Sequence, residues 1–377
     1  MIKRYVSIEN LEKILISNKD RFKVNTSQRK ILKNKFKSKN ILVLGAAGSI
    51  GKKFVIKLID FNFKKLYLMD KDENELTELN RQINIKNKRK KIDYICGDII
   101  NFPFRSFLRE KKINLILNFA AIKHVRSEEN NYSLNYMFKT NSLNFLNFEY
   151  SKNVESIFSI STDKVYKPTS MLGISKKLME YVLTKIKEKN PKIEISSVRF
   201  TNVSFSNGSI LKNIYDKILS NKIVGVPKNI QRYFITHEEA VSLCLKSFLN
   251  ETRNMIIQPS DYYVNKAFDL KELSLKIFNV MGVKVKLKGK NKNIVFQTKI
   301  SQGQKLVEDL NEGSENYDYI KSDVSIKRVN FYRLKNLNQI LNKINNCKNK
   351  NNYINLARKI YPKFRFLDNK TKVSKII

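Results

Sequence analysis

The chain has 377 residues, of which 42% are hydrophobic, 23 are Phe and 17 are Tyr. This composition excludes wholesale disorder and is sufficient for a large nucleotide-binding domain with a smaller companion. The formal net charge of +39 would attract nucleic acid or anionic small molecules. However, the chain is crowded with Lys, Asn and Ile and has no Trp, which is typical of AT-rich codon usage. We therefore expect no specific nucleic-acid site.

No apolar run approaches the roughly 18 residues of a membrane-spanning helix, and the N-terminal segment lacks the pattern of a secretion signal. We therefore expect a cytoplasmic protein without a membrane span. The cysteines, Cys96, Cys244 and Cys347, lie too far apart in sequence for a metal spacing or a disulfide framework. Since the chain has only 2 histidines, we expect no metal site.

Residues 1–38 are basic, and Ile, Leu and Phe recur in them at helical intervals. This pattern predicts an N-terminal helical extension. Such an extension is either an oligomerisation arm or a packing helix, and the sequence does not decide between them. We expect the protein to form a homo-oligomer.

From residue 40 onward, short apolar segments alternate with helical patterns. The predicted strands are residues 41–44, 66–70, 94–96, 115–119, 156–160 and 193–199, and the first two helices are residues 51–61 and 73–83. Apolar strands separated by helices imply a parallel sheet covered on both faces, so we predict a Rossmann-type, doubly wound α/β fold. The predicted parts are an NAD(P)-binding domain at 39–205, a substrate-binding region at 206–330 and a C-terminal tail at 331–377, with residues 231–250 also joining the sheet region.

Three glycines, Gly45, Gly48 and Gly51, form a G-x-x-G-x-x-G pattern between the first strand and the first helix. Such glycines let the backbone approach a pyrophosphate or a neighbouring strand, and the helix N-terminus offers N–H groups to phosphates. The pattern predicts binding of NAD or NADP. The expected cofactor contacts in this segment are Gly45, Ala47, Gly48, Ser49, Ile50 and Gly51.

The ends of the next strands supply the other expected cofactor contacts. Asp70 closes the second strand, where its carboxylate would accept hydrogen bonds from the adenosine ribose and favour NAD. The lysine that follows it would suit a 2′-phosphate, so NADP stays open. Asp98 and Ile99 follow the third strand and are placed to meet the adenine. Ala120 and Ala121 follow the fourth strand, where small side chains let the cofactor lie against the backbone.

Ionisable residues gather where the fifth strand ends, in the sequence Ser161-Thr162-Asp163-Lys164. In a sheet of this type, chemistry is expected in the crevice at the carboxyl ends of the strands. Lys176 would lie on the following helix and face the nicotinamide ribose. Further along the chain, Arg232 offers a guanidinium suited to a substrate diphosphate.

These segments identify a family resemblance. The chain resembles the UDP-N-acetylglucosamine 4,6-dehydratases, or CapD-like polysaccharide biosynthesis proteins, of the extended short-chain dehydrogenase/reductase type. Lys123-His124-Val125 and the Ser-Thr-Asp-Lys segment are much more specific than the glycine loop. The matching stretches keep the family's order and are residues 45–51, 120–125, 161–164, 168–176, 199–203, 207–209, 232–236 and 303–310.

The resemblance implies a redox-neutral lyase reaction for bacterial surface polysaccharide or nonulosonic acid synthesis. A UDP-N-acetyl-hexosamine would lose hydride from C4 to bound NAD(P), lose water across C5 and C6, and regain hydride at C6. By resemblance, Thr162 would hydrogen-bond the C4 oxygen, Asp163 would protonate the leaving hydroxyl and Lys164 would take the C5 proton. These proton transfers require a protonated acid and a neutral amine. The expected substrate contacts are Lys123, His124, Asn202, Ser209 and Arg232.

The sequence departs from the family pattern at two positions. Leu172 stands where short-chain dehydrogenases place the Tyr of Tyr-x-x-x-Lys, and Tyr166 is out of register with that position. Thr201 replaces the family's Gly. Two alternatives therefore stay open: a UDP-sugar 4-epimerase, which needs no elimination pair, and a non-catalytic dinucleotide- or nucleic-acid-binding protein. The adjacent Asp163 and Lys164 favour the dehydratase.

Overall fold

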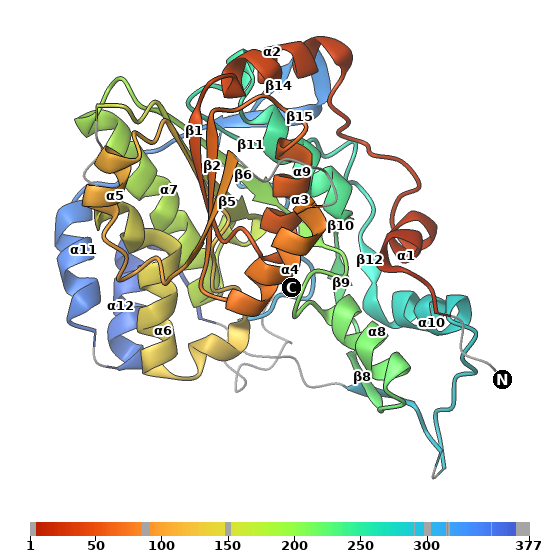
Figure 1. Ribbon diagram of the computed structural model, residues 1–377. Coiled ribbons are helices and arrows are strands. Elements are labelled where there is room, and N and C mark those ends of the chain that lie inside the picture. Colours follow the sequence, from red (N-terminus) through yellow and green to blue (C-terminus); the bar gives the residue numbers. More distant parts are fainter. Residues whose placement is uncertain are drawn as a thin grey trace.

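The computed structural model describes residues 5–84, 91–147, 152–289, 291–297, 303–313, 315, 317–347 and 349–366. A nine-stranded sheet forms its centre, in the order β14-β15-β11-β6-β5-β4-β1-β2-β3. Helices cover both faces of this sheet (Figure 1). The predicted fold class, a Rossmann-type α/β sheet, is confirmed.

All six predicted strands are present, with ends that differ by a few residues. They are parallel neighbours in the sheet: β1 (Asn40–Leu44), β2 (Lys65–Asp70), β3 (Ile92–Cys96), β4 (Leu115–Asn118), β5 (Ser156–Thr162) and β6 (Glu194–Phe200). β1 and β4 are buried along their whole length, which explains why their sequences are continuously apolar instead of alternating. The six strands bring their carboxyl ends to one edge of the sheet.

Helices pack against the two faces through separate apolar clusters. One face is covered by α3 (Ser49–Leu58), α4 (Glu73–Asn84) and α9 (His237–Lys246). The other is covered by α5 (Phe104–Glu110), α6 (Asn131–Phe138) and α7 (Met171–Lys189). The predicted first helix, residues 51–61, begins and ends earlier in the structure, at Ser49 and Leu58. α7 follows β5 after a short 3-10 turn at Asp163–Val165, and it carries Leu172 and Lys176.

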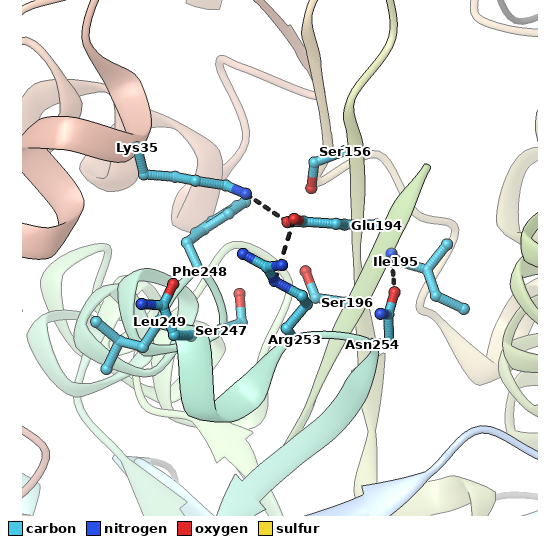
Figure 2. Close-up of a pocket in the computed structure, with 11 residues that line it drawn as sticks. Lys35, Ser156, Glu194, Ile195, Ser196, Ser247, Phe248, Leu249, Arg253 and Asn254 are labelled. Atoms are coloured by element: carbon cyan, nitrogen blue, oxygen red, sulfur yellow. Dashed lines mark hydrogen bonds and ion pairs between the residues drawn. The ribbon is translucent and has the colours of Figure 1, made fainter. Parts of the chain in front are cut away.

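The N-terminal extension contains two helices, α1 (Ile8–Leu15) and α2 (Thr26–Phe36), and both pack on this chain. Between them, both carboxylate oxygens of Glu239 accept hydrogen bonds from Arg21, at 2.5 and 2.9 Å. Lys35 of α2 pairs with Glu194 at the start of β6, and Arg253 Nε lies 3.1 Å from the same carboxylate (Figure 2). The structure therefore shows the packing role that the sequence left open.

The region after β6 forms a third apolar cluster beside the carboxyl edge of the sheet. Helices α8 (Ile210–Leu219) and α10 (Leu270–Val280) lie beside a parallel pair, β8 (Val224–Pro227) and β13 (Ile294–Gln297). Two short pairs tie this cluster to the rest: β7 (Asn202–Val203) with β10 (Phe234–Ile235), and β9 (Gln231–Arg232) with β12 (Phe268–Asp269). Figure 1 shows α8, α10 and β8 set apart from the main sheet.

Two of the expected domain boundaries differ from the structure. β11 (Met255–Pro259), β14 (Tyr317–Ile320) and β15 (Asp323–Asn330) fall within the expected substrate region but extend the central sheet. The expected tail forms α11 (Leu337–Asn345) and α12 (Lys350–Ile360), which pack in the cluster on α6 and α7. Its many Asn and Lys residues obscure the helical spacing of its apolar side chains, which are Leu337, Ile340, Leu341 and Ile344 in α11. Residues 367–377 lie outside the described residues.

The described residues also bear on metal and membrane binding. They contain no group of three or more His, Cys, Asp or Glu side chains placed to hold a metal ion. Cys96, Cys244 and Cys347 are free thiols. None of the helices in the described ranges combines the length and the apolar character needed to cross a bilayer.

Candidate active site

The three glycines of the loop after β1 have different physical roles. Gly45 has φ +69°, and a Cβ there would lie 2.5 Å from the backbone nitrogen of Ala120. A Cβ on Gly51 would lie 2.1 Å from the carbonyl oxygen of Gly45. At Gly48 the nearest atom would be 3.4 Å away, and this N-cap of α3 makes no side-chain cap bond. Gly45 and Gly51 are thus required by the chain itself, whereas Gly48 leaves open space at the N-terminus of α3.

Asp70 and Asp98 lie at adjacent strand ends beside this loop. Asp70 Oδ2 accepts the N–H of Ala47 at 3.0 Å, so the carboxylate braces the glycine loop. Asp98 accepts the hydroxyl of Tyr136 at 2.7 Å. Burial and the nearby Asp98 raise the pKa of Tyr136 to about 12, which keeps this hydroxyl a donor. Ile99 is buried in the core.

A cleft of about 1590 Å³ lies between the carboxyl edge of the sheet and the third apolar cluster. Within the described residues, its lining contains none of the glycine loop. The loop is nevertheless adjacent, because the N–H of Asn207 donates to Ser49 Oγ at 2.8 Å. The residues singled out from sequence that line the cleft are Lys123, His124, Lys164, Leu172, Asn202, Ser209 and Arg232.

The end of β5 carries a compact group of ionisable side chains. Lys164 Nζ lies 3.0 Å from Asp163 Oδ1 and 3.6 Å from Glu308 Oε1. Thr162 Oγ1 donates to the same Asp163 oxygen at 2.9 Å. Lys164 also donates to Asn202 Oδ1 at 3.5 Å. The Asp163 and Glu308 side chains are only 3% and 4% exposed, whereas that of Lys164 is 23% exposed, so the amine is the accessible member of this group.

Burial and mutual charge set the protonation of these three groups. Burial raises the pKa of Asp163 in spite of the attraction of Lys164. Burial would lower the pKa of Lys164, but the carboxylates of Asp163 and Glu308 outweigh it and raise that pKa. Burial would likewise raise the pKa of Glu308, but Lys164, Arg232 and Lys305 lower it. The pKa of Asp163 thus shifts in the direction expected for an acid, whereas that of Lys164 shifts away from the neutral amine expected from sequence.

Lys176 and Leu172 lie one turn apart on α7. Lys176 is 3% exposed, and its Nζ donates to the carbonyl of Ile160 at 3.0 Å. Burial lowers the pKa of Lys176 to about 7, against the attraction of Glu180. Leu172 presents no hydroxyl to the cleft that it lines. Tyr166 does not substitute for one, because its buried ring lies 4.8 Å from the guanidinium carbon of Arg199.

Arg232, Ser209 and His124 have local partners that the sequence did not reveal. The Arg232 guanidinium donates to the carbonyls of Gln231, Leu306 and Lys305 at 2.7 to 3.0 Å. It therefore fixes the segment at 303–313, and its contact with a diphosphate stays a prediction. Ser209 caps α8. A Cβ on Gly208 would lie 2.1 Å from the His124 ring, so this glycine lets the ring pack against the backbone.

Two buried carboxylates in the site were missed by sequence reasoning. Glu128 accepts the backbone N–H groups of Met171 and Leu172, at 3.0 and 3.1 Å, and so holds the first turn of α7. Burial raises the pKa of Glu128 to about 7. Glu308 lines the cleft beside Lys164, with its Oε1 3.6 Å from Lys164 Nζ. Glu308 lies within a stretch that carries the family resemblance, and Glu128 lies three residues after one. Their position in the sequence is the signal that points to them.

A family described as "Polysaccharide biosynthesis protein" matches residues 41–329. The chain belongs to this family. The match begins at β1 and ends at β15, so it includes the glycine loop, the Ser-Thr-Asp-Lys segment and Glu308.

Curated relatives match over part of their length. An uncharacterized membrane protein of Methanocaldococcus jannaschii is 32% identical over 222 residues, 57% of this chain and 65% of the relative. The capsular polysaccharide biosynthesis protein CapD of Staphylococcus aureus is 28% identical over 74% of this chain and 46% of its own length. A UDP-N-acetylglucosamine 4,6-dehydratase (inverting) of Campylobacter jejuni is 26% identical over 56% of this chain and 64% of its own. The chain thus spans about half to two thirds of these relatives.

Solved structures share the fold. Pen from Bacillus thuringiensis superposes with a TM-score of 0.65 and 22% identity, over 78% of this chain and 88% of that one. A dTDP-glucose 4,6-dehydratase from Bacillus anthracis in complex with NAD gives 0.57 and 16%, over 73% and 88%. A UDP-N-acetylglucosamine 4-epimerase from Methanobrevibacter ruminantium, in complex with UDP-N-acetylmuramic acid, gives 0.56 and 17%, over 74% and 90%.

Proposed function

We propose that this protein is an NAD(P)-dependent lyase that converts a UDP-N-acetyl-hexosamine to its UDP-4-keto-6-deoxy derivative. The observation that carries the proposal is the group of Asp163, Lys164 and Glu308 at the end of β5, of which Lys164 and Glu308 line the large cleft. Elimination of water across C5 and C6 needs an acid and a base close to the same carbon pair. The group offers a buried carboxylic acid together with two further candidates for proton transfer.

The described residues fit a dinucleotide. The open side of Gly48 and the uncapped start of α3 would receive the pyrophosphate. Asp70 and Asp98 would lie along the adenosine half, and Ala120, Ala121 and Lys176 along the nicotinamide half. When bound, the dinucleotide would supply the hydride acceptor for C4 and the hydride donor for C6.

The chain's own residues would manage the oxygen and proton chemistry. Thr162 would hydrogen-bond the C4 oxygen from the end of β5, and Asp163 would protonate the departing C6 hydroxyl. Lys123, His124, Asn202 and Ser209 would hold the substrate. A buried Lys176 with a pKa of about 7 would assist proton removal from the C4 hydroxyl, where Leu172 supplies no phenol.

A direct assay tests the proposal. Purified protein is incubated with UDP-N-acetylglucosamine, and the nucleotide sugar is followed by mass spectrometry and NMR. We expect the loss of one water and the appearance of a C6 methyl group. An unchanged substrate, in protein that carries a dinucleotide, would contradict the dehydratase assignment.

A UDP-sugar 4-epimerase is the second candidate. The raised pKa of Lys164, caused by the neighbouring carboxylates, is compatible with it, since epimerisation at C4 requires no neutral base at C5. The shared fold with a UDP-N-acetylglucosamine 4-epimerase is consistent with it. In the same assay, an epimerase would yield a product of unchanged mass. The coupling constants of its C4 proton would show the inverted configuration at C4.

A further inference from the structure

The segment at residues 202–209 joins separate parts of the site. At its start, Lys164 donates to Asn202 Oδ1 at 3.5 Å. Near its end, the N–H of Asn207 donates to Ser49 Oγ at the start of α3, at 2.8 Å. One short segment therefore contacts both the end of β5 and the glycine loop, so its conformation decides how these two parts face a ligand in the cleft.

This segment holds a strained backbone conformation. Phe205 has φ +49°, which lies in the left-handed region that a bulky side chain rarely adopts. Such a conformation persists only where the surrounding structure fixes it. The Phe205 side chain is buried in the third apolar cluster, and Leu11 of α1 belongs to the same cluster. Contacts from outside the segment therefore maintain its conformation, and α1 supplies some of them.

Glu12 of α1 ties this segment to the start of α9. Its Oε1 accepts the hydroxyl of Ser204 and the backbone N–H of His237, the latter at 3.1 Å, and His237 Nδ1 lies 2.8 Å from the same oxygen. Glu12 and Ser204 are both buried, so water does not compete for these bonds. Hydrogen bonds to a carboxylate are also stronger than those between neutral groups. Because Ser204 directly precedes Phe205, this bond acts where the backbone is strained.

The helix that carries Glu12 lies outside residues 41–329, to which the family match extends. α1 lies beside α10 (Figure 1). Just before α1, the carbonyl of Val6 accepts the hydroxyl of Tyr215 in α8, at 3.1 Å. The N-terminal extension thus contacts the two helices beside the cleft as well as the strained segment, through contacts that the family match does not include.

We propose that Glu12 is a positioning residue for substrate binding. By holding Ser204, it keeps the segment at 202–209 in the conformation that presents Asn202 and Ser209 to a nucleotide sugar in the cleft. The inference rests on the proposed function for the identity of this ligand. Without the bond, the segment relaxes in most molecules, and the apparent affinity falls with the fraction that stays ready to bind. Substrate that does bind selects the held conformation, so the rate of the bound complex is unchanged.

The test measures binding of UDP by calorimetry and turnover of UDP-N-acetylglucosamine by mass spectrometry. Because UDP has no sugar to react, its affinity reports on the cleft independently of the chemistry. Glu12→Ala and Ser204→Ala should each weaken UDP binding and raise KM by about tenfold, with kcat within about twofold of wild type, since each removes the same buried bond. For that reason the double variant should also lose about tenfold, not about a hundredfold.

Glu9→Gln is the matched control. Glu9 lies on the same helix, but its carboxylate pairs with Lys53 of α3 at 2.6 Å, where both side chains are exposed. This variant should bind UDP with wild-type affinity. A tenfold loss here would show that any change in α1 disturbs the cleft, and the role assigned to Glu12 would be wrong.

Thermal unfolding of each variant separates binding from stability. If Glu12→Ala and Ser204→Ala unfold at lower temperature but bind UDP as wild type does, the contact is only structural and the inference is wrong. A hundredfold loss in the double variant would also contradict it, because Glu12 would then act without Ser204. If Glu12→Ala does not fold, Ser204→Ala decides alone, since it keeps the contacts between Glu12 and His237. Wild-type protein that binds neither UDP nor UDP-N-acetylglucosamine would instead overturn the proposed function.

Discussion

The two ends of the central sheet both carry clustered charges, but only one has space beside them. At the amino end, Glu194 lies between Lys35 and Arg253 around a hollow of about 10 Å³ (Figure 2), which is room for about one water molecule. At the carboxyl end, Lys164 lies between Asp163 and Glu308 on a cleft of about 1590 Å³. A charge cluster therefore indicates a reaction site only where a ligand has room to approach it.

The difference has a topological cause. Parallel strands send their carboxyl ends into loops that diverge to opposite faces, which opens a crevice at that edge. At the amino end, α2 and the turn at Arg253 close over the start of β6, and the charges there bind each other. The same residue types thus hold the fold together at one end and face a cavity at the other.

The largest effect on turnover is expected from a substitution at the carboxyl end of the sheet. Asp163→Asn removes a buried acid without changing its shape, so turnover should fall about a hundred- to ten-thousand-fold, while binding of the nucleotide sugar persists. Turnover is followed as loss of water from UDP-N-acetylglucosamine. Equal loss of binding and turnover would mean that Asp163 holds the substrate instead of moving a proton.

The second prediction concerns the glycine loop. Gly48→Val places its side chain in the open space at the start of α3 and should abolish dinucleotide binding while the protein stays folded. Gly51→Ala, in contrast, should destabilise the fold, because its Cβ would overlap the Gly45 carbonyl oxygen. Dinucleotide released on denaturation and circular dichroism measure the two effects. Wild-type protein that neither contains nor binds NAD or NADP would refute the site.

The third prediction restores the missing tyrosine. Leu172→Tyr should raise the rate of substrate oxidation by about tenfold, since a tyrosine beside Lys176 could, as a phenolate, take the C4 hydroxyl proton in general-base catalysis. The reduced-nicotinamide absorbance after rapid mixing reports this step. A slower oxidation would show instead that Thr162 already performs this task and that the ring crowds the cleft.

The fourth prediction is a pH dependence of stability caused by Lys176. Its pKa is about 7 in the folded protein and about 10.5 when unfolded, so between these values the unfolded chain binds more protons. The free energy of unfolding should therefore rise with pH across this window, by at most about 1.4 kcal/mol per pH unit. Lys176→Met should remove this component of the slope in urea titrations. An identical slope in the variant would place the titration elsewhere.

The smallest effect is expected at the amino end. Glu194→Gln breaks the pairs with Lys35 and Arg253, which are partly exposed to solvent. It should lower the free energy of unfolding by about 1 kcal/mol or less and leave turnover unchanged. Thermal unfolding and the same turnover assay measure both. A marked loss of turnover would show that the two ends are coupled.

Much of the site could be predicted from sequence because its pieces are local. The glycine loop, the Ser-Thr-Asp-Lys segment and Lys176 each follow a strand, and strand ends are visible in the apolar pattern. The C-terminal helices α11 and α12 were not predicted, because abundant Asn and Lys obscured their apolar stripe. Glu128 and Glu308 received no role, because neither has a partner close in sequence.

The sequence by itself determined the Rossmann-type sheet, the dinucleotide loop and the cluster at the end of β5, since each depends on local periodicity and on residues next to one another. Only the tertiary structure decided which carboxylates surround Lys164, that Arg232 holds the segment of Glu308, and that Gly48 alone of the three loop glycines has an open side. These properties depend on burial and on contacts between distant segments. Burial and such contacts are also what fix the protonation of Asp163, Lys164 and Glu308, and hence which of them can move a proton.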